Sequence, residues 1–117
     1  KWIEAAAIEL NWPSSVISLD DYYLPAEEMK KAIFGNPWNV ARGFPGSHSV
    51  NLLEETVGNW INNGHLISPK FDKALMNGMG DRCGWSNCYP KLLIIEGWFL
   101  GCPTLKNTTK KINPKTF

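Results

Sequence analysis

The sequence predicts an α/β fold in which a parallel sheet packs against helices. Two short runs, residues 16–19 and 92–95, are apolar without alternation, which is typical of strands buried on both faces of a parallel sheet. Segments of helix-forming composition lie between these runs, as expected for an α/β protein. Because 117 residues suffice for one hydrophobic core, we expect a single domain over residues 1–117.

Three segments are predicted to be helical. Residues 1–10 have helix-forming composition and end before Pro13. Residues 25–33 begin with a proline and carry acids before lysines, which complements the helix dipole. Residues 50–63 place apolar side chains on one face, between Ser49 as N-cap and Gly64 as a left-handed terminator. Residues 65–71 are predicted to be extended, and residues 35–46 and 72–90 to be loops.

Composition and charge exclude several classes of function. The 12 basic and 11 acidic residues leave a net charge of +1, which offers no basic face for a nucleic acid. No apolar run approaches the roughly 20 residues needed to cross a bilayer. The 3 cysteines do not make a disulfide framework, and residues 1–10 do not resemble a signal peptide. We therefore expect a cytoplasmic protein without nucleic-acid or membrane partners.

Acidic residues follow both predicted parallel strands. Asp20 and Asp21 come after one strand, and Glu96 comes after the other. Open parallel sheets bind ligands beyond the carboxyl ends of their strands, where a carboxylate can accept a proton or hold a divalent cation. Acids at strand ends also serve as turn formers and helix caps, and this structural interpretation stays open for each of them.

Two loops combine charged residues with glycines. One runs from Arg42 to His48 and could hold a carboxylate or a phosphate, or could be a tight connection only. The other contains Asp72 and Lys73 and continues to Arg82. A loop of this length inside a compact domain is usually functional or disordered.

These segments together resemble one family of kinases. The chain is similar to D-glycerate 3-kinase-type proteins, within the P-loop kinases that include uridine kinase, phosphoribulokinase and pantothenate kinase. The resemblance covers roughly residues 1–103. It implies a partial P-loop NTPase-type three-layer fold. Its motifs, in chain order, are Leu19-Asp20-Asp21-Tyr22-Tyr23, the 42–48 segment RGFPGSH, the 69–73 segment PKFDK, Gly80-Asp81-Arg82 and the 96–101 segment EGWFLG.

The resemblance also implies a role for each site residue. Asp20 would be the general base for the acceptor hydroxyl, and Arg82 would assist the transfer of the phosphoryl group. Glu96 would order Mg²⁺, which the intact kinase would use together with ATP. The residues expected to bind the small-molecule acceptor, glycerate or a similar hydroxylated acid, are Asp21, Tyr23, Arg42, His48, Asp72 and Lys73.

The chain departs from the family pattern in its phosphate-binding part. Gly-x-x-x-x-Gly-Lys-Ser/Thr occurs nowhere in it, and no initiator methionine precedes Lys1. We therefore expect a central fragment of a kinase, without the first strand and the lid region and without ATP turnover of its own. The alternative is a non-catalytic binding or oligomerisation module derived from a kinase. An open edge at residues 92–95 would favour a homo-oligomer or a strand-swapped dimer.

Two further interpretations concern cysteines and tryptophans. Cys83 and Cys88 could form a zinc site with Cys102 and with His65 or His48, although the spacing is loose. Trp60 and Trp98 are predicted to pack in the core, since one lies on an apolar helix face and the other follows an apolar strand. Tyr22 is predicted to turn inward beneath the sheet edge.

Overall fold

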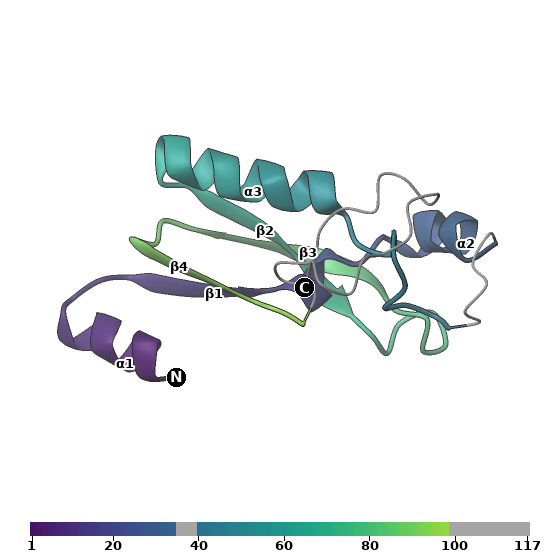
Figure 1. The fold of residues 1–117 in the computed structure, drawn as a ribbon, viewed down its shortest axis with the longest axis horizontal. Helices are drawn as coiled ribbons and strands as arrows, with labels where there is room; N and C mark the ends of the chain where they lie inside the picture. Colours follow the sequence, from purple (N-terminus) through teal and green to yellow (C-terminus); the bar gives the residue numbers. More distant parts are fainter. Residues whose placement is uncertain (35–39, 99–117) are drawn as a thin grey trace, which may run out of the picture.

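The computed structural model describes residues 1–34 and 40–98. Its elements are three α-helices, one short 3₁₀ helix and four strands arranged as two two-stranded sheets (Figure 1). The expectations for residues 35–39, for Cys102 and for the end of the chain lie outside the described residues.

The first sheet is parallel, as predicted. Strand β1 (Ser14–Ser18) pairs with β4 (Leu92–Glu96), from Ser14 opposite Leu92 to Ser18 opposite Glu96. In the described residues the two faces of this sheet are covered unequally. Ile17 is buried but Val16 is exposed, because the core lies on one side of β1 only. The apolar run of β1 is too short to reveal this alternation.

The second sheet is antiparallel and corrects the prediction of a loop over residues 72–90. Strand β2 (Leu66–Asp72) nearly coincides with the extended segment predicted over residues 65–71. It pairs with β3 (Asp81–Cys88). Strand β3 alternates between exposed and half-buried positions, and its glycine and polar side chains hide this pattern in the sequence. The turn before β3 contains Asn77-Gly78, both with positive φ, and Asn-Gly is a hairpin signal that the loop prediction overlooked.

The three helices occur where they were predicted. They are α1 (Trp2–Glu9), α2 (Ala26–Phe34) and α3 (Val50–Asn63). Gly64 ends α3 at φ 70°, and its N–H donates a 2.7 Å hydrogen bond to the Trp60 carbonyl. Ser49 occupies the N-cap position but makes no capping hydrogen bond through its side chain. Helix α3 lies along β2 (Figure 1).

Two buried clusters hold the short 3₁₀ helix η1 (Leu19–Tyr22) between them. Tyr22, 1% exposed, turns inward as predicted, and it packs with Ile17 and Leu66 beneath α3. The next residue, Tyr23, belongs to the other cluster, together with Met29 and Phe44. Because consecutive tyrosines enter different clusters, the backbone that carries Asp20 and Asp21 is restrained from both sides.

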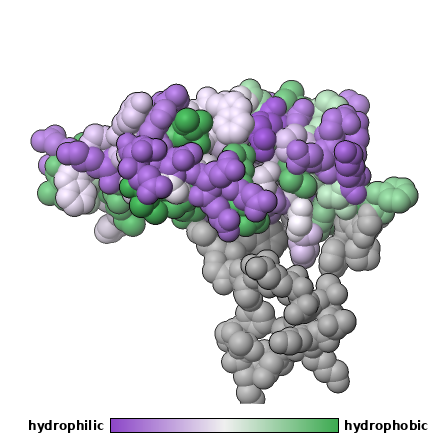
Figure 2. Space-filling view, turned by 90° about the horizontal axis from the view of Figure 1, so that it is seen from above, coloured by the Kyte–Doolittle hydropathy of each residue, from purple (hydrophilic) through white to green (hydrophobic). Residues whose placement is uncertain are grey.

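The surface is mixed in character. On the side of α3 it is largely hydrophilic, with hydrophobic side chains in between (Figure 2). Helix α1 buries only Ala7 and leaves Trp2, Ile3 and Ile8 exposed. No helix in the described part of the chain is long and apolar enough to span a membrane.

Candidate active site

The carboxyl ends of β1 and β4 lie side by side. Ser18 is opposite Glu96 in the register, and Asp20 follows Ser18 by two residues. The Asp20 N–H donates a 3.2 Å hydrogen bond to Ser18 Oγ, which orients the start of η1. The acids after the two strands therefore share one sheet edge, as expected for parallel neighbours.

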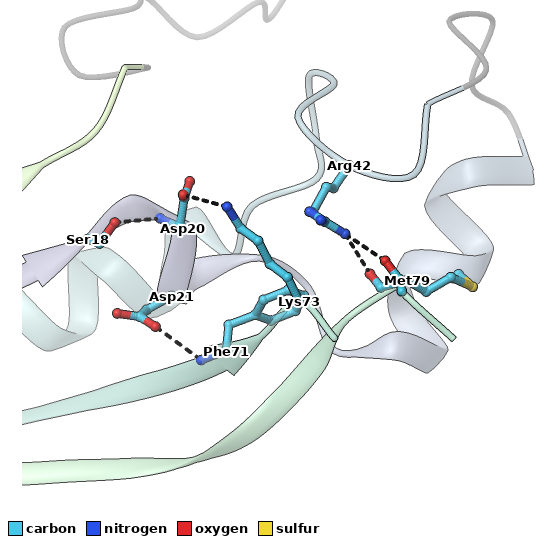
Figure 3. Close-up of polar contacts among 8 residues, drawn as sticks. Ser18, Asp20, Asp21, Arg42, Phe71, Lys73 and Met79 are labelled. Atoms are coloured by element: carbon cyan, nitrogen blue, oxygen red, sulfur yellow. Dashed lines mark hydrogen bonds and ion pairs between the residues drawn. The ribbon is translucent and has the colours of Figure 1, made fainter. Parts of the chain in front are cut away.

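Asp20 is paired with a lysine from a distant part of the chain. Lys73 Nζ lies 3.0 Å from Asp20 Oδ2 (Figure 3). The two side chains are 50% and 41% exposed. An exposed ion pair of this kind contributes only about 0–1 kcal/mol to stability. Both charged groups are therefore accessible to a ligand, which can compete for either one at small cost.

Lys73 reaches Asp20 because of a local turn at the end of β2. Asp72 Oδ1 accepts a 2.9 Å hydrogen bond from the Ala74 N–H, so its carboxylate closes an Asx turn around Lys73. Asp72 was predicted to bind substrate. Its observed contact gives it a positioning task, and direct contact with substrate stays a prediction.

Asp21 and Asp81 hold the elements around Asp20 in place. Asp21 Oδ1 accepts a 3.1 Å hydrogen bond from the Phe71 N–H, which ties η1 to β2 (Figure 3). Asp81 Oδ1 accepts 2.8 Å hydrogen bonds from the N–H groups of Ala26 and Arg82 and so caps the start of α2. Sequence reasoning assigned Asp21 to substrate and missed the cap that Asp81 provides.

Tyr23 lies at the centre of the site. Its ring stacks on His48, with centroids 4.3 Å apart, and tilts against Phe71 at 5.4 Å. Burial, followed by the nearby charge of Asp20, raises the pKa of the Tyr23 hydroxyl, while Lys73 and Arg42 oppose the shift. Tyr23 is therefore a neutral hydroxyl at neutral pH, next to the Asp20 carboxylate.

His48 is held in its neutral form. Burial lowers the pKa of its imidazole, and the charge of Asp20 opposes this effect only in part. The imidazole is thus uncharged near pH 7, so His48 contributes a ring surface and polar nitrogen atoms to the site.

Arg42 is hydrogen-bonded to backbone carbonyl groups. Its guanidinium donates hydrogen bonds to the carbonyls of Gly78 at 3.0 Å and Met79 at 3.3 Å (Figure 3). Arg42 therefore joins the 40–48 segment to the turn between β2 and β3. Its predicted contact with substrate stays a prediction.

Arg82 faces a separate pocket at the start of α3. This pocket has a volume of about 430 Å³, and His48, Ser49 and Glu28 also line it. The guanidinium donates to Ser49 Oγ at 3.4 Å, while its Nε is buried without a hydrogen-bond partner in the described residues. The first turn of α3 carries no acid. Arg82 is therefore the cation of a pocket that adjoins His48.

The structure brings together only part of the predicted site. Asp20, Tyr23, His48 and Lys73 form one cluster. Within residues 1–34 and 40–98, no hydrogen bond or ion pair joins Asp20 to Arg82, the two residues predicted to be catalytic.

The sequence also did not reveal the position of Trp98. It was predicted to pack in the core, but it is 69% exposed. The apolar strand before it ends at Glu96, so Trp98 lies past the sheet edge. Trp60 packs against the core as predicted, and its indole N–H donates to the Pro90 carbonyl at 2.8 Å.

The described residues do not support the zinc interpretation. They contain no group of three or more His, Cys, Asp or Glu side chains placed to hold a metal ion. Cys83 and Cys88 are five positions apart on β3 and so fall on opposite faces of that strand. Cys83 is exposed, and Cys88 packs beside the core.

Comparisons with known proteins relate this α/β fold to kinases. No family model matches the chain. A protein of Saccharomyces cerevisiae named "Probable ATP-dependent kinase TDA10" is 38% identical over 72% of this chain and 33% of its own length. The chloroplastic D-glycerate 3-kinase of Arabidopsis thaliana is 33% identical over 87% of this chain and 25% of its own.

A solved structure is similar to the chain as well. The D-glycerate 3-kinase from Cryptococcus neoformans var. grubii superposes with a TM-score of 0.71 and 27% identity, over 82% of this chain and 36% of that one. The chain is thus similar in sequence and in fold to D-glycerate 3-kinases, and in sequence to a probable ATP-dependent kinase, as the resemblance predicted. It spans between 25% and 36% of the length of these relatives.

Proposed function

We propose that this chain forms the acceptor-binding part of an ATP-dependent kinase that phosphorylates D-glycerate or a similar small hydroxylated acid. The observation that carries the proposal is the accessible Asp20–Lys73 pair at the carboxyl end of the parallel strands. The homology to D-glycerate 3-kinases supports the substrate class.

Asp20 would orient the acceptor hydroxyl. In phosphoryl transfer the hydroxyl oxygen attacks the γ-phosphorus of ATP, the bond to the β-phosphate oxygen breaks, and ADP leaves. The hydroxyl proton passes to an Asp20 carboxylate oxygen. An aspartate is a weak base near pH 7, so this proton moves late and Asp20 acts mainly by positioning.

Lys73 would hold the carboxylate of the acceptor. An ammonium group has three donors, so Lys73 can keep Asp20 in place while it donates to a second carboxylate. Tyr23 and His48, both neutral, would complete the surface beneath the acceptor. Arg82 would meet an anionic group of the bound ligands in its pocket beside His48.

Glu96 is suited to the Mg²⁺ that this chemistry needs. Mg²⁺ is usually held by one or two carboxylates together with waters and substrate phosphates, so a single exposed carboxylate beside Ser18 fits this donor set. The ion would neutralise charge on the phosphates.

A cytoplasmic location remains a prediction.

Binding of D-glycerate tests the proposal. We expect titration of the ¹⁵N-labelled chain to shift the amide signals of Asp20, Tyr23 and Lys73. Asp20→Asn is expected to weaken binding about tenfold or more, since a hydrogen bond to a charged group contributes about 1.5–3 kcal/mol. Glu54→Gln, which removes an exposed acid on α3, should bind as the unsubstituted chain does. Equal affinity of the Asp20→Asn chain would contradict the proposal.

The same chain is proposed to lack ATP turnover, because its 117 residues contain no phosphate-binding loop motif. Incubation with ATP, Mg²⁺ and D-glycerate should yield no ADP above the background of the Asp20→Asn chain. Production of ADP that depends on Asp20 would contradict this part of the proposal.

Self-association through β4 is also proposed. One edge of β4 pairs with β1, and no strand among the described residues pairs with the other. An apolar open edge recruits another strand. We expect a concentration-dependent dimer in analytical ultracentrifugation. Ile94→Lys should abolish it, because Ile94 lies in the middle of β4 and a lysine on an open strand opposes pairing at its edge. Val16→Lys on β1 is the control, and a monomer at all concentrations would exclude the dimer.

A further inference from the structure

A close approach between two elements determines where Trp98 lies. A Cβ atom added to Gly97 would come within 2.6 Å of Leu19 Cγ, so only glycine lets the chain after β4 pass this close to η1. Leu19 is the residue before Asp20. The contact therefore brings Trp98 to the part of the sheet edge that carries the candidate base.

The indole borders the same space as the Tyr23 hydroxyl. A Cβ atom built on Gly43 would lie 3.7 Å from Trp98 Cζ2 and 3.9 Å from Tyr23 Oη. The charge of Asp20 raises the pKa of the Tyr23 hydroxyl and the charge of Lys73 lowers it, so both groups lie near this hydroxyl. Trp98, Tyr23 and the Asp20–Lys73 pair are thus neighbours, although they come from three separate parts of the chain.

The exposure of Trp98 leaves apolar surface beside two charged groups. Trp98 is 69% exposed, although tryptophan is among the residues that gain most from burial. Small-molecule sites combine aromatic surface with a few placed polar groups, and this arrangement supplies both.

We propose that Trp98 is a specificity-determining residue whose indole covers the carbon chain of the acceptor. The inference rests on the proposed function. The hydroxyl and carboxylate of the acceptor would face Asp20 and Lys73, and its C–H groups would lie against the indole. Trp98 would thereby favour a three-carbon hydroxy acid over a two-carbon one, which has less surface to cover.

The test measures dissociation constants of D-glycerate and of the two-carbon acid glycolate for the 117-residue chain. Trp98→Ala is expected to weaken D-glycerate binding about tenfold, which corresponds to about 1.4 kcal/mol. Burial of roughly 55 Å² of apolar surface would account for that loss at about 25 cal/mol per Å². Glycolate binding should change less than twofold. Trp98→Phe should restore most of the D-glycerate affinity.

Trp2→Ala is the matched control, because it removes an exposed tryptophan from α1 without touching the site. If Trp98→Ala binds D-glycerate as the unsubstituted chain does, or weakens both acids equally, the inference is overturned and the proposed function stands. If the unsubstituted chain binds neither acid, the proposed function is overturned and the inference falls with it.

Discussion

Replacing Gly80 with alanine is expected to lower the free energy of unfolding by about 3 kcal/mol. Gly80 has a φ of +82°, which costs a residue with a Cβ atom about 1 kcal/mol. Its Cβ would also lie 2.5 Å from Cε1 and Cζ of Phe71 and 3.3 Å from the Asp72 carbonyl oxygen. Overpacking of this kind costs about 1–3 kcal/mol more. Urea denaturation followed by circular dichroism measures the total.

Gly78→Ala separates the two contributions to this effect. Gly78 has a similar φ of +87°, but a Cβ atom there meets nothing within 4 Å. Its replacement should cost only about 1 kcal/mol. Equal losses for the two variants would show that the contact with Phe71 contributes nothing. Because Phe71 tilts against Tyr23, Gly80→Ala should also weaken D-glycerate binding, whereas Gly78→Ala should not.

Replacing Lys73 with methionine is expected to weaken D-glycerate binding at least about tenfold, since it removes a charge-assisted hydrogen bond contributing about 1.5–3 kcal/mol. Methionine keeps most of the length of the side chain but removes the ammonium group. Stability should change little, because the Asp20–Lys73 pair is exposed. Isothermal titration calorimetry measures the affinity, and urea denaturation measures the stability.

The chain offers a matched control for this variant. Lys30 forms an exposed pair with Glu27 at 3.2 Å, and its side chain is 51% exposed, against 50% for Lys73. Lys30→Met therefore removes the same charge in the same kind of pair, on α2. Its D-glycerate affinity should equal that of the unsubstituted chain. A similar loss in both variants would mean that net charge, and not contact with Lys73, governs binding.

Local sequence patterns were sufficient to predict the helices and the parallel pair of strands. Residues 50–63 combine an apolar face with Gly64, and the structure has a helix over the same residues, closed by a left-handed glycine. The runs at 16–19 and 92–95 fall in strands β1 and β4, which pair in parallel, except that Leu19 already begins η1. These elements follow from side chains that are close in sequence, so periodicity and capping residues predict them.

Strand β3 could not be predicted in the same way. Its residues Cys83, Trp85 and Asn87 point to solvent, and few apolar side chains mark its other face. Pairing with β2 stabilises it, and that partner is brought back by the turn at residues 73–80. A strand that depends on its neighbour more than on its own composition leaves little signal in the sequence.

The candidate site also has features that the sequence determined and features that only the structure revealed. The sequence by itself determined that acids follow the two parallel strands and that the chain resembles D-glycerate 3-kinases. Only the tertiary structure decided that Lys73, 53 residues from Asp20, is its partner and that Arg82 faces another pocket. It also decided that Trp98 lies at the surface beside Tyr23. The physical reason is that these contacts depend on how turns and glycines bring distant segments together, which no local pattern records.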